Sequence, residues 1–454
     1  MASKYKNVFD NKALRKLILP LILEQALAIT VGMADAMMVS SAGEAAISGV
    51  SLVDMLNNLF IGLLASFATG GAVVTSQFIG AGKPQEACRS AKQLVWSVTG
   101  ITIILTAVIL IVRYPMLRLF FGTVEDDVMD ACLTYLIITA ISFPFLALYN
   151  SGAALFRSMG NSAVTFKISV LMNIINVCGN AIGIYVLKMG VAGVAVPSLI
   201  SRAVASIIII YLLKNQNLQI HIEKGMFKPD RSVIGKIFYI GVPSGIENAI
   251  FQLGRVIVVS VIAHFGTVQI AANGVANSLD SMGCIVGQAM NLAMITVIGQ
   301  CVGARDEKQI KYYTGKLLII TYAASTALNG VILLFLNQIL RLFSISPETT
   351  ELAYTLVMIH NGFAIFMWPV AFVLPNMLRA CNDVTYTMVV SIASMFIFRI
   401  GLSYVLGIGF GMGAIGVWLA MVVDWIARLT AFIIRVKNEK WKEKCGLTFS
   451  SAEA

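Results

Sequence analysis

The sequence contains little charge, and this shortage excludes an ordinary soluble enzyme. Charged residues make up 12% of its 454 positions and hydrophobic residues 58%, whereas soluble domains typically carry about 25% charged residues. The mean hydropathy is +0.84. Apolar runs such as 98–112 and 317–336 approach or reach the roughly 20 residues that cross a bilayer. We therefore predict an all-α polytopic membrane protein.

Motifs that carry catalysis or bind cofactors are also missing. The sequence has no GxxxxGK[ST] phosphate loop, no HExxH and no GxSxG. We therefore expect neither an enzyme nor a cofactor, and transport would be driven by an ion gradient or run downhill. The cysteines form no CxxC pair and are expected to pack in apolar segments rather than to bind metal: Cys88, Cys132, Cys178, Cys284, Cys301, Cys381 and Cys445.

Charged residues interrupt the apolar runs and divide the chain into twelve predicted spans. No cleavable signal peptide is visible before the first span. The second span is long and contains Gly70 and Gly71, which predict a bend or an extension beyond the membrane. The predicted spans are 17–40, 47–79, 91–113, 131–155, 163–187, 190–213, 234–264, 270–302, 315–336, 352–379, 385–407 and 413–436.

The net charge of +10 is explained by topology rather than by nucleic-acid binding. Most Lys and Arg residues lie in the termini, in the even-numbered loops or at the adjoining span ends, and few lie on the opposite side (Arg113, Arg118, Lys188 and Arg341). The positive-inside rule then predicts a multi-pass protein of the inner (plasma) membrane with both termini in the cytoplasm. The predicted parts are a cytoplasmic N-terminus (1–16), an N-terminal lobe (17–213), a cytoplasmic linker (214–233), a C-terminal lobe (234–436) and a cytoplasmic tail (437–454).

The two lobes repeat one another. Pro20 and Glu24 match Pro243 and Glu247 at an offset of 223, and SQFIGAGKPQEA (76–87) matches GQCVGARDEKQI (299–310) at the same offset. LFRSMGNS (155–162) matches MLRACNDV (377–384) at 222, and KMGVAGV (188–194) matches GMGAIGV (411–417) at 223. Because each lobe has six spans, the lobes enter the membrane in the same orientation. This predicts two six-helix bundles related by a pseudo-two-fold axis along the membrane normal, as in one class of secondary transporters.

These blocks resemble the multidrug and toxic compound extrusion (MATE) family of antiporters. The resemblance rests on the first-span Asp followed by MVSSAG, on SQFIGAGK, on RSMGN and on MGVAGVAVPSLIS, and it covers roughly residues 15–435. It implies two six-helix bundles that exchange Na⁺ or H⁺ for organic, often cationic, compounds.

Asp35 is the main candidate for cation coupling, because a carboxylate within a span costs a few kcal/mol and is functional by default. The family resemblance implies a site built from a first-span Asp, an Asn and an Asp on span five, and a hydroxyl on span six. Asp35, Asn176 and Ser198 match, whereas Asn180 stands where the second acid is expected. The site would bind Na⁺ or a proton, with the proton favoured; a structural hydrogen bond is the alternative. At the offset of 223, Asp35 corresponds to Val258.

Glu247 and its repeat mate Glu24 are further coupling candidates. The resemblance implies a span-seven Glu in the C-terminal lobe, and the alternative for both residues is a structural partner of a helix-end amide. A salt bridge with Arg255, two turns further along the span, is the alternative for Glu247.

The remaining charges within spans have structural alternatives. We expect Arg399 and Asp424 to form a structural ion pair, because buried charges in membranes usually pair. Asp54 and Asp280 lie near span ends and are expected to be solvated.

The tenth span supplies the substrate-binding candidates His360, Phe363, Phe366 and Trp368. Aromatic faces attract organic cations, although packing or lipid contact is the common role of such residues. The leading hypothesis is thus an antiporter of small organic molecules that works by alternating access. The close rival is a lipid-linked sugar or lipid flippase of the same superfamily, which should carry several basic residues in its cavity; Arg202, Arg255 and Arg399 are the candidates.

Overall fold

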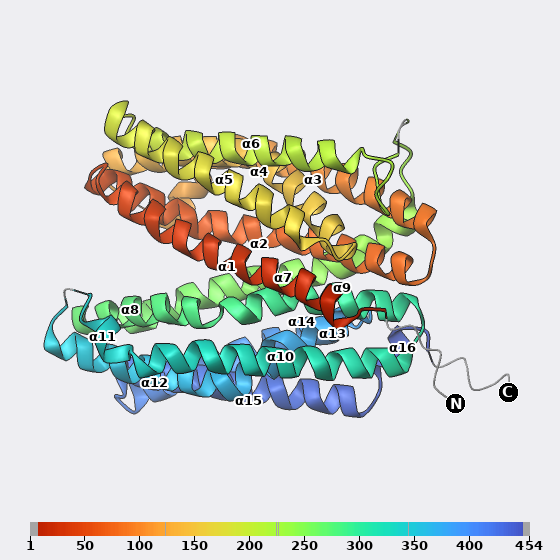
Figure 1. The fold of residues 1–454 in the computed structure, drawn as a ribbon. Helices are drawn as coiled ribbons and strands as arrows, with labels where there is room; N and C mark the ends of the chain where they lie inside the picture. Colours follow the sequence, from red (N-terminus) through yellow and green to blue (C-terminus); the bar gives the residue numbers. More distant parts are fainter. Residues whose placement is uncertain (1–7, 123, 224, 226, 344, 448–454) are drawn as a thin grey trace. The chain divides into compact units, whose positions relative to one another are not determined.

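The structure is a computed structural model that describes residues 8–122, 124–223, 225, 227–343 and 345–447. The regular elements of this described part are helices, of which four (η1–η4) are π-helical (Figure 1). In chain order they are α1 (Asn11–Ser40), α2 (Glu44–Gly80), α3 (Pro84–Phe121), α4 (Asp126–Ser158), α5 (Ser162–Ala181), η1 (Ile182–Val186), α6 (Ala192–Leu213), α7 (Arg231–Ala263), α8 (Thr267–Gly283), α9 (Ile285–Gly303), α10 (Glu307–Leu334), α11 (Leu336–Leu340), α12 (Pro347–Trp368), η2 (Pro369–Val373), α13 (Leu374–Ala380), α14 (Val384–Ser394), η3 (Met395–Gly401), η4 (Ser403–Gly409), α15 (Gly413–Lys437) and α16 (Trp441–Lys444).

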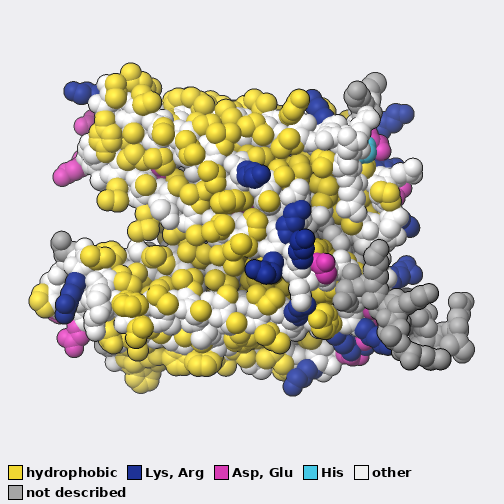
Figure 2. Space-filling model, in the orientation of Figure 1, with side chains coloured by type: hydrophobic (Ala, Val, Ile, Leu, Met, Phe, Trp, Pro, Cys, Tyr) yellow, Lys and Arg dark blue, Asp and Glu magenta, His cyan; other side chains and the backbone are white. Residues whose placement is uncertain are grey.

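Twelve helical segments of the described chain are long and apolar enough to cross a membrane. Hydrophobic side chains cover most of the visible surface of these helices in Figure 2. Among the exposed apolar side chains, Ile104, Ile111 and Ile207 are more than half exposed. Such side chains need an apolar surrounding, because water does not solvate them favourably. The predicted all-α membrane class is confirmed.

The described chain forms two compact units. One runs from Asn11 to Gly245, and the other contains the described residues up to Asp10 and from Ile246 onward. The division falls inside α7, downstream of the 214–233 linker, because the first half of α7 packs on α2. A Cβ atom on Gly241 would lie 3.1 Å from the backbone of Phe67. The lobe boundaries given above stay a prediction.

Within the first unit, α4 lies between α2, α3 and α6, and α1 packs on α5. Of the bend and the extension predicted for the second span, the structure agrees with the extension, since α2 is one continuous helix of 37 residues. At 1.5 Å per residue it measures about 55 Å, longer than a hydrocarbon core of ~30 Å. Its glycines permit close approach instead. Gly70 faces the carbonyl of Ile237 and the amide of Gly241, and Gly71 faces the Leu94 side chain.

Within the second unit, α12 packs on α8, α10 and α15, and α9 packs on α10 and α13. The prediction of one continuous span over 270–302 is wrong, because the helix is interrupted at Cys284, which separates α8 from α9. Next to this break, a Cβ on Gly283 would lie 2.9 Å from Nδ2 of Asn361, so a larger residue there would displace the neighbouring side chains.

The π-helical segments fall in the spans that carry candidate site residues. η1 begins two residues after Asn180 in the fifth span, and η3 contains Arg399 in the eleventh. A π-turn widens the helix and often marks a functional position. Neither segment follows from the hydrophobic pattern of the sequence.

Candidate functional site

Asp35 on α1 lies beside two asparagines of α5. Nδ2 of Asn180 donates to Oδ1 of Asp35 at 2.8 Å. The Asn176 amide is best oriented with Nδ2 3.0 Å from both carboxylate oxygens of Asp35 and with Oδ1 accepting from the Ser198 hydroxyl at 2.9 Å. Asn180 is fully buried, Asn176 is 8% exposed, and Asp35 is half-buried. The structure therefore brings all four residues of the predicted N-terminal site together.

Glycines set this geometry by letting the end of the fifth span approach α6. A Cβ on Gly193 would lie 2.8 Å from the carbonyl carbon of Gly183, and one on Gly179 would lie 2.6 Å from Cβ of Pro197. Real Cβ atoms do not approach so closely, so a larger residue would push the helices apart and separate Asn176 from Ser198.

Asp54 on α2 is a second acid of this unit and is partly exposed. Its Oδ1 accepts from the phenol of Tyr135 at 3.0 Å and from Nδ2 of Asn57 at 3.2 Å. The expectation that Asp54 is solvated stays a prediction. Arg202 on α6 donates to the Ser142 hydroxyl at 2.6 Å.

Glu24 and Glu247 each meet an arginine of the fourth span of their own lobe. Oε2 of Glu247 accepts from Arg379 Nη2 at 2.7 Å. Oε1 of Glu24 lies 3.7 Å from Nη1 of Arg157, and its Oε2 accepts from the Thr165 hydroxyl at 3.0 Å. The partner of Glu247 is thus Arg379 and not Arg255. Arg157 and Arg379 belong to the repeat block offset by 222, so the two ion pairs are equivalent. A coupling role for either glutamate stays a prediction.

Asp424 on α15 is fully buried and has two arginine neighbours. Nε of Arg428 donates to its Oδ1 at 2.9 Å, whereas Nη1 of Arg399 lies 3.9 Å from its Oδ2. The Ser394 hydroxyl also donates to Asp424. The ion pair expected between Arg399 and Asp424 is therefore the longer of two contacts. The i, i+4 spacing of Asp424 and Arg428 signalled the closer one.

A third polar cluster lies at the break between α8 and α9. Oδ1 of Asp280 lies 2.7 Å from Nε2 of His360 and accepts from the Cys284 thiol at 3.2 Å. One ligand atom from each residue lies within 4.8 Å of the others, so the group could hold a metal ion. The Asp280 side chain is 21% exposed, so its solvation stays a prediction, and Cys284 contacts a carboxylate as well as apolar groups.

The four substrate-binding candidates do not lie together. His360 is 2% exposed and meets the Trp425 ring edge-on at 4.9 Å. Trp368 is 8% exposed and stacks on Phe372 at 4.9 Å. Phe363 and Phe366 are 40% and 70% exposed on the surface of their unit. Substrate contact by these residues stays a prediction.

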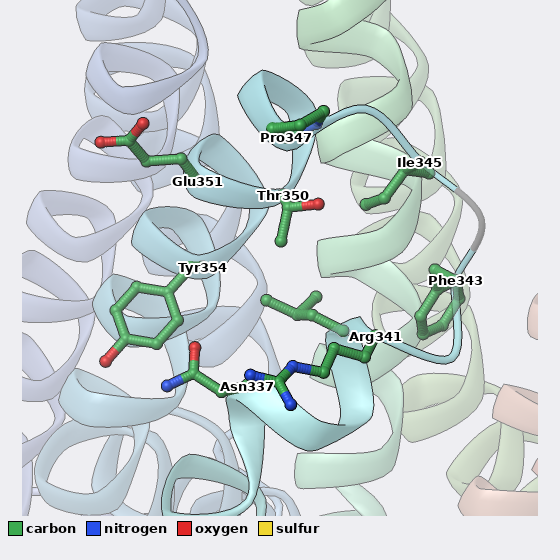
Figure 3. Close-up of a pocket in the computed structure, with 9 residues that line it drawn as sticks. Asn337, Arg341, Phe343, Ile345, Pro347, Thr350, Glu351 and Tyr354 are labelled. Atoms are coloured by element: carbon green, nitrogen blue, oxygen red, sulfur yellow. The ribbon is translucent and has the colours of Figure 1, made fainter.

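A pocket of about 530 Å³ lies between α11 and the first turns of α12 (Figure 3). Its charged lining residues are Arg341 and Glu351, and the predicted site residues are not part of its lining. The complete lining consists of Asn337, Leu340, Arg341, Phe343, Ile345, Pro347, Thr350, Glu351 and Tyr354. It lies at the end of a helix, apart from the predicted site residues.

Twelve apolar helices in two repeated halves, with polar clusters inside each half, define a membrane transporter of the two-bundle class. A family model named MatE matches residues 20–182 and 243–405. The chain belongs to the MatE family. The two matched segments begin 223 residues apart, which is the offset of the internal repeat.

Relatives and solved structures agree with this assignment. The chain is 26% identical to the uncharacterized transporter YisQ of Bacillus subtilis, over 96% of this chain and 98% of that protein. It is 25% identical to the probable multidrug resistance protein NorM of Thermotoga maritima, over 96% and 94%. It superposes with a TM-score of 0.87 on an outward-facing multidrug resistance MATE transporter of the MOP superfamily, at 21% identity over 95% and 96% of the two chains. A MOP superfamily transporter from Pyrococcus furiosus, reported with a binding pocket of reverse polarity, matches with a TM-score of 0.86 at 21% identity, over the same shares.

Proposed function

We propose that this protein is an antiporter that exports organic, often cationic, compounds in exchange for a proton or Na⁺. The observation that carries the proposal is the half-buried Asp35 carboxylate, held by Asn176 and Asn180. A carboxylate inside an apolar span is costly unless it serves ion movement or a structural bond. Here its partners are neutral amides rather than a close arginine, so the carboxylate can change its charge without leaving a partner charge unpaired.

The proton is favoured over Na⁺ as the coupling ion. The atoms that approach the Asp35 oxygens are amide nitrogens, which donate hydrogen bonds and cannot ligate a cation. A Na⁺ ion would require these amides to turn their oxygens inward, and Asn180 replaces the second acid that would help to bind it. One proton needs one carboxylate.

Coupling follows from alternating access. Entry of the cation at Asp35 in the outward-open state favours release of the exported compound and return to the inward-open state. Ion and compound need not share a site, because each only has to favour a different conformation. One charge moving through 100 mV supplies about 2.3 kcal/mol, which supports roughly a fifty-fold gradient.

We also propose an orientation with both termini in the cytoplasm, across the plasma membrane. The distribution of Lys and Arg supports this orientation, since long apolar helices are retained with their basic loops inside.

Efflux of a fluorescent organic cation from vesicles containing the full chain tests the proposal. A pH or Na⁺ gradient is imposed, and wild type is compared with Asp35→Asn. We expect gradient-driven efflux in the wild type and at least a tenfold loss in the variant, on the order of the effect of removing an essential proton-transfer group. Glu44→Gln, an exposed acid at the start of α2, is the matched control. Efflux that ignores both gradients would overturn the antiporter, and normal coupling in Asp35→Asn would overturn the site.

A further inference from the structure

The C-terminal lobe contains the repeat counterpart of the Asp35 site, and the charge of this counterpart is inverted. At the offset of 223, Asp35, Asn176 and Ser198 correspond to Val258, Arg399 and Met421. The contacts support this correspondence. Asn176 meets Ser198 at 2.9 Å, and Arg399 Nη2 meets Met421 Sδ at 3.1 Å, each pair being 22 residues apart.

The three counterpart residues line one cavity of about 40 Å³. Its lining comes from α7, α8, η3 and α15 and consists of Arg255, Val258, Val259, Asn273, Asn277, Arg399, Val417, Trp418 and Met421. The cavity has no acidic residue in this lining and has two guanidinium groups. It lies wholly within the second unit.

Hydrogen-bond donors in the lining outnumber the acceptors available to them. Nε of Arg399 is buried and has no hydrogen-bond partner within the described chain. Oδ1 of Asn273 already accepts from the Trp418 indole at 3.1 Å, which leaves its amide nitrogen for the cavity. Asp424 lies 3.9 Å from Arg399 but is held more closely by Arg428, at 2.9 Å. One carboxylate is thus shared by two guanidinium groups, and Arg255 and Asp280 add one positive and one negative charge nearby.

We propose that this cavity binds an anionic group, a carboxylate or a phosphate, of the transported molecule. A planar guanidinium recognises such groups through paired hydrogen bonds and keeps its charge at any physiological pH. The volume suits one small group, because a single water molecule occupies about 30 Å³ in the liquid. The cavity is therefore a subsite, and the rest of the molecule lies outside it.

This inference rests on the proposed export function and narrows its substrate class. A lobe with a carboxylate site is joined in the chain to a lobe with a guanidinium site. The preferred compounds carry an acidic group, either alone or together with a positive charge. A purely cationic compound leaves the Arg399 subsite unfilled.

Two forms of one dye test the inference. A rhodamine methyl ester is a cation, and the corresponding free acid carries a carboxylate in place of the ester group. Binding to the purified full-length protein is measured by fluorescence anisotropy without any ion gradient. We expect the wild type to bind the acid about tenfold more tightly than the ester, as one charged hydrogen-bonded contact provides, and we expect Arg399→Gln to abolish this preference. Equal affinity for acid and ester in the wild type, or a preference that survives in Arg399→Gln, overturns the inference.

Two further variants separate binding from folding. Arg399→Gln leaves Asp424 paired with Arg428, so the fold should persist, and this is checked by thermal unfolding. Arg399→Lys retains the charge without the planar fork and should show an intermediate preference. Arg305→Gln, an exposed arginine of the same unit, should keep the wild-type preference. A loss of preference in Arg305→Gln would overturn the assignment to this cavity.

The source of the anion is resolved by competition. Displacement of the acid by phosphatidylglycerol but not by inorganic phosphate assigns the subsite to a lipid headgroup, and displacement by inorganic phosphate assigns it to a soluble phosphate group. Resistance to both leaves the carboxylate as the recognised group. Because binding is measured without a gradient, failure of ion-driven efflux would overturn the proposed function without removing the acid preference.

Discussion

The two lobes keep one polar contact in common and differ at another. Near the start of each lobe, a glutamate meets an arginine of the fourth span, at 3.7 Å for Glu24 and Arg157 and at 2.7 Å for Glu247 and Arg379. About three turns further along the same helix, Asp35 of one lobe is replaced by Val258 in the other. The ion pair is thus common to both bundles, whereas the second position carries a different side chain in each.

Among substitutions at corresponding positions of the two lobes, Asp424→Asn is expected to cause the largest loss of stability. The N-terminal lobe has Ser201 at the position of Asp424. The change leaves Arg428 and Arg399 buried without their shared carboxylate. Breaking a buried ion pair on one side costs about 3–5 kcal/mol. Thermal unfolding in detergent should show a large loss of stability for Asp424→Asn and a small one for Ser201→Ala. Similar losses at both positions would contradict the asymmetry.

A smaller loss of stability is expected at the Glu–Arg ion pairs, which the two lobes share. Glu247→Gln removes the closer of the two equivalent ion pairs and should cost about 2 kcal/mol, against about 1 kcal/mol for Glu24→Gln. Unfolding of the two variants gives the order directly. The opposite order would mean that the 3.7 Å pair is the stronger one. Efflux by folded Glu247→Gln then shows whether this acid also couples ions.

The smallest effect is expected just after the C-terminal lobe, where Glu439 of the tail corresponds to Gln216 of the linker at the offset of 223. Hydrogen bonds from Lys311 and Lys442 lower the pKa of Glu439 below its ordinary 4.5. A lowered folded-state pKa stabilises the protein above the ordinary value, and this contribution is lost as the pH falls through the folded-state pKa. The wild type should therefore unfold at a slightly higher temperature than Glu439→Gln at pH 7, and the difference should vanish in acid. Because the group is exposed, salt should also reduce the difference; a difference that grew in acid would contradict this origin.

The sequence predicted the class of fold because its apolar runs and its repeat are properties of the chain itself. Twelve spans, two halves and the grouping of Asp35 with Asn176, Asn180 and Ser198 all agree with the structure. The break at Cys284 and the π-helical segments do not change the hydrophobic pattern, so composition could not reveal them.

The sequence did not predict contacts between residues that lie far apart in the chain. Glu247 was weighed against Arg255, its neighbour on the same helix, whereas its partner Arg379 is 132 residues away. Helical spacing identifies neighbours on one helix only. Yet the repeat contained a usable signal, because both glutamates and both arginines recur in matching blocks.

The shared offset of 223 also has a historical meaning. Two halves that descend from one duplicated segment begin with identical sites, so each present difference arose after the duplication. The Glu–Arg pair is present in both halves, whereas Asp35 of one half corresponds to Val258 in the other, where Val258 and Arg399 line a cavity. Under the proposed anion subsite, the two halves would bind groups of opposite charge, which two identical halves could not do.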